Sequence, residues 1–273
     1  MTASDNRHSR TLAAHLSTVL LLDSSVAGSR VTQEILKGLG AGRIVTETSD
    51  ERALALCRQI EPKIIITELR GPALDGLKFV RALRRSSFTC RKAPVIVITA
   101  QATASSLTAA RNAGAHEFMC KPFTIRDLTR RLEAVAIGQR DWIEAVSYVG
   151  PDRRRFNSGD YRGPRKRIAD AGGVGARMEQ ALRILAAAVK AIDSDAAQAL
   201  RAMRAQSVDL AAIATSTNDT QLMADVATLQ RCLAEASASG QLSRAQVEAG
   251  VADLLARLPA EKPQAEQTQA RVA

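Results

Sequence analysis

Five short apolar runs, each followed by a helical pattern, dominate the first half of the chain. They cover residues 18–22, 43–47, 63–67, 94–99 and 116–120. The runs are largely apolar and do not alternate with polar residues, which is typical of strands that are covered on both faces. Five strand–helix repeats at short spacing predict an α/β fold with a doubly wound parallel sheet of five strands.

Polar residues near the starts of the predicted helices support this division. Ser49 or Asp50 is placed to cap the helix that follows the second run. Thr124 and Asp127 have the spacing of a capping box in front of the helix that follows the fifth run. The helices therefore have defined starting points.

Such a sheet presents functional groups at the carboxyl ends of its strands. The chain delivers Asp23 and Ser24 after the first run, Glu68 after the third, Thr99 at the end of the fourth and Lys121 after the fifth. The carboxyl ends of parallel strands meet at one edge of the sheet. We therefore expect these side chains to share one site.

Four segments carry a resemblance to the receiver domain of bacterial response regulators, the flavodoxin-like (CheY-like) module of two-component signalling. They read LLLDSS, IIITELRGPALDGL, VIVITAQA and AGAHEFMCKPF, and they occur in the family's order. The resemblance covers residues 17–136. It implies a phosphoacceptor aspartate after the third strand, two acids that hold magnesium after the first, and a hydroxyl and a lysine that engage the phosphoryl oxygens. Thr99 and Lys121 fill the last two positions, and Phe118 stands where the family often has a switch aromatic.

Two positions depart from that pattern. The acceptor position is Glu68, and the acidic pair has become Asp23-Ser24. The extra methylene of glutamate moves the carboxylate by about 1.5 Å, and a misplacement near 1 Å can cost in-line displacement about a hundredfold. Neutral Ser24 also weakens a site for magnesium, which prefers hard and usually carboxylate oxygens. We expect no cofactor and no resident metal, with weak magnesium binding at Asp23 and Glu68 as the upper limit.

These departures predict a pseudo-receiver that does not await phosphorylation. In this hypothesis Glu68 forms an ion pair with Lys121 and accepts a hydrogen bond from Thr99, in partial imitation of a phosphorylated acceptor. Two alternatives stay open: a decayed pocket in a domain that serves as a scaffold, and residual phosphorylation. For Phe118, a place in the core is the simpler interpretation.

Other residue patterns indicate a non-enzymatic, cytoplasmic protein. The histidines His8, His15 and His116 do not form a catalytic set, and the sequence has no Gly-rich phosphate loop or nucleophile elbow. The four scattered cysteines are expected to be reduced thiols. The apolar run after Arg10 is interrupted by polar residues, and no stretch is long enough to span a bilayer.

A basic Gly/Pro linker is predicted over residues 137–175. It contains a loose duplicate, Tyr148-Val-Gly-Pro-Asp-Arg-Arg and Tyr161-Arg-Gly-Pro-Arg-Lys-Arg, and Gly-Pro pairs interrupt regular structure. Similar segments follow some bacterial receiver domains. The linker is open to three interpretations: a solvated connection, a docking strip for an acidic protein, or a nucleic-acid contact with steep salt dependence. The basic residues concerned are Arg153, Arg154, Arg155, Arg165, Lys166 and Arg167.

Residues 176–260 contain four helical patterns that predict an antiparallel helical bundle. Asn218-Asp219 marks the start of the third pattern, and Ser243 with Gln246 has the spacing of a capping box for the fourth. Flexible ends are predicted over residues 1–16 and 261–273. The expected apolar stripes of the first two helices are Met178, Leu182, Leu185 and Val189, and Leu200, Met203, Val208 and Leu210.

The composition of this second part limits its function. The chain has a net charge of +10, but the excess lies upstream of about residue 176, so a DNA-reading helical domain is unattractive. No histidine follows His116, which excludes a histidine phosphotransfer module. The remaining class is interaction or oligomerisation. The sequence therefore predicts a regulator that contacts signalling proteins through both domains, as a possible homo-oligomer and without a membrane. A conventional phosphorelay regulator and a nucleic-acid-binding regulator that uses the basic linker are the alternatives.

Overall fold

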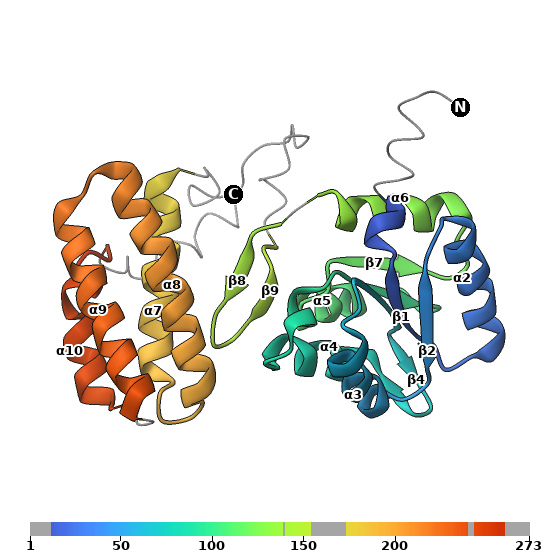
Figure 1. Ribbon diagram of the computed structural model, residues 1–273, viewed down its shortest axis with the longest axis horizontal. Helices are drawn as coiled ribbons and strands as arrows, with labels where there is room; N and C mark the ends of the chain where they lie inside the picture. Colours follow the sequence, from blue (N-terminus) through green and yellow to red (C-terminus); the bar gives the residue numbers. More distant parts are fainter. Residues whose placement is uncertain (1–11, 139, 154–172, 240–242, 260–273) are drawn as a thin grey trace, which may run out of the picture. The chain divides into compact units, whose positions relative to one another are not determined.

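The computed structural model of the chain describes residues 12–138, 140–153, 173–239 and 243–259. These residues divide into two units by their contacts. The α/β unit contains residues 12–143 and 147–153, and the helical unit contains residues 144–146 and the described residues from 173 onward. Figure 1 shows the α/β unit in blue to green and the helices of the helical unit in yellow to red.

The α/β unit is built on five parallel strands in the order β2-β1-β3-β6-β7. The strands are β1 (Thr18–Leu22), β2 (Arg43–Glu47), β3 (Ile64–Glu68), β6 (Val95–Thr99) and β7 (Glu117–Cys120). The predicted doubly wound sheet is confirmed. The strand order reverses at β1 and β3, so the carboxyl ends of these two strands flank the topological switch point.

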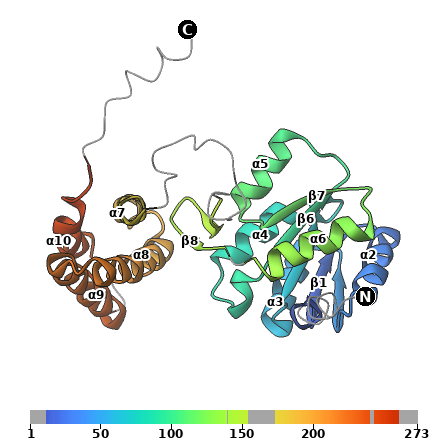
Figure 2. The same cartoon turned by 90° about the horizontal axis from the view of Figure 1, so that it is seen from above.

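Five α-helices cover the two faces of this sheet (Figure 2). Two of them, α2 and α6, share one core cluster with Leu12 and Leu16, and the other three share a second cluster that includes Leu83. The helices are α2 (Val26–Gly38), α3 (Asp50–Ile60), α4 (Gly76–Arg85), α5 (Ala104–Ala113) and α6 (Ile125–Ala136). Between them lie the short pair β4 (Arg70–Gly71) and β5 (Leu74–Asp75) and the 3-10 helix η1 (Thr89–Lys92).

The helix starts follow the local sequence. Ser49 caps α3 by accepting a hydrogen bond from the backbone N–H of Arg52. Thr124 and Asp127 form both hydrogen bonds of the predicted capping box. A second capping box, Thr103 with Ser106, starts α5 and was not anticipated.

The first described residues belong to the core. Residues 12–15 form a helical turn, and Leu12 and Leu16 are buried against α2 and α6. A flexible N-terminus through residue 16 is therefore wrong for residues 12–16, because apolar side chains in this stretch find a place in the core. Residues 1–11 and the predicted tail at 261–273 lie outside the described residues.

Part of the predicted linker is an ordered hairpin. Strands β8 (Trp142–Glu144) and β9 (Val149–Pro151) pair with each other. A Cβ atom added to Gly150 would lie 2.8 Å from the Cα of Gly114, so β9 approaches the loop after α5 at a distance that only glycine permits. The linker prediction is therefore wrong for residues 142–153. Residues 139 and 154–172 of that stretch lie outside the described residues.

A buried arginine holds the amino-terminal end of the sheet together. Arg84 is 1% exposed. Its guanidinium donates to the carbonyls of Gly114 at 3.0 Å, Ala93 at 2.9 Å and Arg91 at 2.5 Å, and it lies 3.2 Å from the Nδ1 atom of His116. Burial lowers the pKa of Arg84 to about 9, which leaves it cationic at neutral pH. Trp142 from β8 adds a ring whose centre lies 5.3 Å from the guanidinium carbon.

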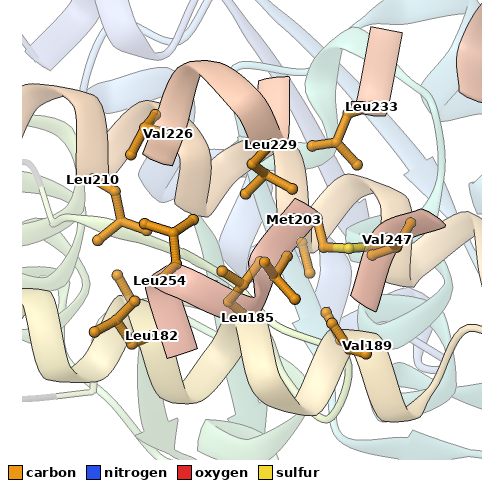
Figure 3. Packing of buried hydrophobic residues seen from close by; sticks show 14 of the residues in the cluster. Leu182, Leu185, Val189, Met203, Leu210, Val226, Leu229, Leu233, Val247 and Leu254 are labelled. Atoms are coloured by element: carbon orange, nitrogen blue, oxygen red, sulfur yellow. The ribbon is translucent and has the colours of Figure 1, made fainter. Parts of the chain in front are cut away.

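The helical unit contains the predicted bundle of four helices. They are α7 (Val174–Lys190), α8 (Ala196–Thr217), α9 (Thr220–Ser239) and α10 (Arg244–Leu255). Each helix contacts the next, and α10 returns to α7, so the bundle is closed. Figure 3 shows leucines, valines and Met203 from these helices meeting in the shared core.

Two details of the helical unit differ from the sequence predictions. Val208 was assigned to the apolar stripe of α8 but is 64% exposed, because the neighbouring position Ser207 takes the inward place. Ser243 stands at the N-cap of α10 but makes no capping hydrogen bond, so that capping box is not formed. None of the described helices has both the length and the apolar character needed to cross a membrane.

Candidate functional site

The predicted site residues meet at the carboxyl ends of β1, β3 and β7. Asp23 and Ser24 follow β1, Glu68 ends β3 and Lys121 follows β7. Because β1 pairs with β3 in register, with Leu22 opposite Thr67, the residues beyond these strand ends come close together. The sheet therefore brings charged groups from distant parts of the sequence to one edge.

Lys121 bridges two carboxylates at this edge. Its Nζ atom lies 3.1 Å from Glu68 Oε1 and 3.0 Å from Asp23 Oδ2. The ion pair between Lys121 and Glu68 was expected from the sequence, but the share that Asp23 takes in it was not. The Asp23 side chain is 4% exposed, that of Glu68 15% and that of Lys121 24%, so the acids are largely shielded from water and the lysine is partly exposed.

Ser24 occupies the other oxygen of Glu68. Its hydroxyl lies 2.6 Å from Glu68 Oε2 and its backbone N–H lies 3.1 Å from the same atom. From the sequence, Ser24 was interpreted only as the loss of a metal-binding acid, whereas its hydroxyl also donates to the glutamate. Both carboxylate oxygens of Glu68 thus have partners within the protein.

The predicted hydrogen bond from Thr99 to Glu68 is wrong. The Thr99 hydroxyl instead accepts from the backbone N–H of Gln101 at 3.1 Å and lies 3.3 Å from the carbonyl of the same residue. Threonine side chains readily form hydrogen bonds with nearby backbone groups. Here the backbone of Gln101 is the partner of Thr99, in place of Glu68. Thr99 therefore stabilises the loop that follows β6.

Two glycines allow the loop after β3 to close around the pocket. A Cβ atom at Gly76 would lie 2.1 Å from the carbonyl oxygen of Glu68, and one at Gly71 would lie 2.4 Å from the Cβ of Ser24. Asp75 caps α4 by accepting from the backbone N–H groups of Leu77 and Lys78. Asp75 and Gly76 therefore shape this loop, and Gly71 adds a second close approach.

The contacts shift the ionisation of the pocket. Burial raises the pKa of Glu68, but the hydrogen bonds from Ser24 and Lys121 outweigh it, and the net pKa lies below the ordinary value. Burial lowers the pKa of Lys121, but its bonds to Asp23 and Glu68 outweigh that effect and raise the net pKa. At neutral pH the pocket holds a carboxylate of Glu68 and an ammonium of Lys121.

This donor set does not fit a resident magnesium ion. The available oxygens are two carboxylates already bonded to Lys121 and one hydroxyl already bonded to Glu68. Magnesium would have to displace these partners to gain the near-octahedral oxygen shell that it requires. In the described part of the chain, no three His, Cys, Asp or Glu side chains are grouped as a metal site.

The other predicted site residues lie apart from this pocket chemistry. Phe118 is half-buried and packs against the core cluster of α3, α4 and α5. Arg153 lies over the ring of Tyr148, 3.5 Å from its centre, and bonds to Asn112 at 2.7 Å. The remaining members of the basic strip, Arg154, Arg155, Arg165, Lys166 and Arg167, lie outside the described residues.

Comparisons with known proteins concern the α/β unit. Residues 19–133 match the family model described as the response regulator receiver domain. Chemotaxis protein CheY1 of Helicobacter pylori is 29% identical over 124 residues, which are 45% of this chain and 98% of that protein. The KDP operon transcriptional regulatory protein KdpE of Escherichia coli is 35% identical over 117 residues, 43% of this chain, and the match spans 50% of KdpE. The structure of Vibrio cholerae chemotaxis protein CheY4 aligns with a TM-score of 0.41 and 24% identity, over 44% of this chain and 98% of that one.

Proposed function

Since residues 19–133 are a response regulator receiver domain, we propose that this chain is a signalling regulator whose receiver works through protein contacts and not through phosphotransfer. The observation that carries the proposal is the pairing of Glu68. One of its carboxylate oxygens is bonded to Lys121 and the other to Ser24. The carboxylate of Glu68 thereby supplies a negative charge beside Lys121.

Phosphotransfer would need a different arrangement of the same groups. An acceptor carboxylate has to present an oxygen in line with the incoming phosphoryl group, with a metal ion to neutralise the developing charge. Here the attacking position is taken up by hydrogen bonds, and the groups that would hold magnesium are Asp23 and a neutral serine. Both requirements fail together, which favours a receiver whose state is set by its own residues.

The proposed output is contact with a protein partner. On the helices α5 and α6, Leu107 is 47% exposed and Ile125 61% exposed, so apolar side chains are available on a surface that receivers commonly use. The helical unit adds a second potential contact surface. No catalytic role is proposed for either unit.

Intact-mass measurement after incubation with a small phosphodonor and magnesium tests this proposal. We expect no added phosphoryl mass on the wild-type chain. The variant Glu68→Asp should also remain largely unlabelled, because Ser24 still leaves the metal site one acid short. The double variant Glu68→Asp/Ser24→Asp restores both features and serves as the positive control. A stable phosphoryl adduct on residues 19–133 of the wild-type protein would overturn the proposal.

Nucleic-acid binding through the basic residues at 153–155 and 165–167 is the second candidate. The net charge of +10 favours it, whereas the engagement of Arg153 by Tyr148 and Asn112 reduces what that residue can offer. Retention on heparin that falls steeply with salt, and that is lost when these arginines become alanine, would support it. Retention unchanged by those substitutions would remove this candidate.

A further inference from the structure

The last residue of β8 and the first two residues of the hairpin loop, Glu144 to Val146, belong by their contacts to the helical unit. Glu144 is 4% exposed and Ala145 is 8% exposed. Val146 packs against the apolar core of the bundle. A short segment that contains a carboxylate is thus buried against helices. Whether the site is specific for this segment depends on the side chains that form hydrogen bonds with it.

Gln198 on α8 receives the carboxylate. It is 0% exposed, and its Nε2 atom donates to Glu144 Oε1 at 3.0 Å and to the carbonyl of Ala145 at 3.2 Å. Its own Oε1 atom accepts from Arg201 at 2.8 and 3.1 Å. Because Arg201 fixes the oxygen side of the amide, the N–H side has to face the segment.

Gln206 on the same helix receives the backbone. It is 3% exposed, and its Nε2 atom donates to the carbonyl of Glu144 at 3.3 Å. Gln198, Ala202 and Gln206 follow each other at intervals of four residues and therefore share one face of α8. Ala202 is fully buried and small, so the face carries an amide donor at each end and little bulk between them.

We propose that this Gln198–Gln206 face of α8 is a binding site for an extended segment that presents a glutamate followed by a small residue, with residues 144–146 as its occupant in this chain. In these contacts both glutamines donate, and the segment accepts through a carboxylate and two carbonyls. Buried amides without acceptors are costly. An empty site would leave the amide N–H groups of both glutamines without acceptors. The site therefore favours a segment that offers a carboxylate and backbone carbonyls.

The site has a consequence for signalling that goes beyond the state of the phosphoacceptor pocket. Residues on both sides of the segment, Ile143 and Ser147, belong to the α/β unit. In its site the segment Glu144–Val146 is itself part of the helical unit. A partner that carries a similar acidic segment would have to displace it. This inference does not rest on how Glu68 behaves.

Cleavage of the full-length chain by a glutamyl endopeptidase tests the proposal, because the enzyme can cut after Glu144 only when the segment leaves its site. Mass spectrometry follows the cut between Glu144 and Ala145. We expect slow cleavage in the wild type and at least about tenfold faster cleavage in Gln198→Leu, since a lost partner of a buried carboxylate shifts the opening equilibrium by that order. Gln206→Leu should show a smaller increase. The matched control Gln230→Leu changes an exposed glutamine of α9 and should leave the rate unchanged.

A second variant guards against a simple folding defect. Gln198→Glu keeps the shape of the side chain and an acceptor for Arg201 but replaces the donating amide with an oxygen that repels Glu144. It should accelerate the cut while circular dichroism shows full helix content. The proposal is overturned if neither Gln198 variant changes the rate of the cut after Glu144. Protection that disappears on dilution would also overturn it, because a second copy of the chain would then be the occupant.

Discussion

The two ends of the sheet in the α/β unit each hold a shielded cation, but they treat it differently. At the carboxyl end, Lys121 is 24% exposed and pairs with the carboxylates of Asp23 and Glu68. At the amino end, Arg84 is 1% exposed and bonds to three carbonyls and a histidine nitrogen. The carboxyl end is held by two carboxylates, whereas the amino end is held by three carbonyls and a histidine that the fold keeps neutral.

This difference indicates that the amino end of the sheet has a structural role, whereas the carboxyl end responds to changes in pH and salt. Ion pairs near the surface contribute little and respond to pH and salt. Hydrogen bonds to a buried charge are stronger, and each buried acceptor left without its donor costs about 1–3 kcal/mol. We therefore expect substitutions at the amino end to affect stability and substitutions at the carboxyl end to affect the pocket.

Replacement of Arg84 should cause the largest loss of stability. In Arg84→Met the carbonyls of Gly114, Ala93 and Arg91 lose their donor at once, and we expect a loss of about 3 kcal/mol or more in the free energy of unfolding. Denaturant unfolding of the α/β unit, followed within the full chain, measures it. Arg81→Met on the exposed side of the same helix is the control and should change stability by less than about 0.5 kcal/mol. A loss below about 1 kcal/mol for Arg84→Met would contradict a structural role.

The acid sensitivity of the amino end is the next expected effect. Burial and the neighbouring Arg84 and Arg140 hold the pKa of His116 well below its ordinary value of 6.5. Its Nδ1 atom already accepts from Arg84 and from the backbone N–H of Val95, so a proton there would break both contacts. The folded state therefore favours the neutral ring. The stability from this preference is complete above about pH 6.5 and falls by up to about 1.4 kcal/mol per pH unit below it.

Unfolding at a series of pH values checks that slope. His116→Gln, which keeps an acceptor but cannot be protonated, should flatten the dependence below about pH 6.5. Replacement of the exposed His15 by glutamine should leave the slope as it is. An unchanged slope in His116→Gln would assign the acid sensitivity to other groups.

The smallest expected effect lies at the carboxyl end. In Glu68→Gln the ammonium of Lys121 keeps Asp23 but loses one carboxylate, and we expect a loss of about 0.5–1 kcal/mol at neutral pH. The pKa of Glu68 is lowered, so its contribution is present above the ordinary value of 4.5 and disappears as the pH falls through the folded pKa. Wild type and Glu68→Gln should therefore converge once the pH has fallen below the folded pKa of Glu68. Glu51→Gln, which changes an 81% exposed side chain, is the control. A constant difference between wild type and Glu68→Gln from neutral to acid pH would contradict the ionic role of Glu68.

The sequence predicted the frame of the molecule because that frame follows from periodicity. Apolar runs gave the strands, and Thr124 with Asp127 marked a helix start. The carboxyl ends of parallel strands lie at the same edge of a sheet, so the proximity of Glu68 and Lys121 could be predicted from the sequence alone. These inferences depend only on local pattern and on the geometry of parallel sheets.

The sequence did not predict the hydrogen-bond partners of polar groups that have several candidates within reach. Thr99 ends the neighbouring strand and was expected to bond Glu68, but its hydroxyl bonds to the backbone of Gln101. Ser24 could be counted as a missing acid or as a donor, and only the structure shows its hydroxyl on Glu68. The Tyr148 segment reads as a linker because Gly-Pro interrupts regular structure. Its order depends on Gly114, which lies far away in the sequence and allows the close approach of Gly150.

Fluorine NMR of beryllofluoride, a phosphoryl analogue, tests the central claim most directly. With the wild-type chain and magnesium we predict that only free beryllofluoride species are observed, because Glu68 keeps its bonds to Lys121 and Ser24. The variant Glu68→Asp/Ser24→Asp should give a bound signal and shows that the measurement can detect one. A slowly exchanging bound signal on the wild type that is lost in Glu68→Gln would contradict the account.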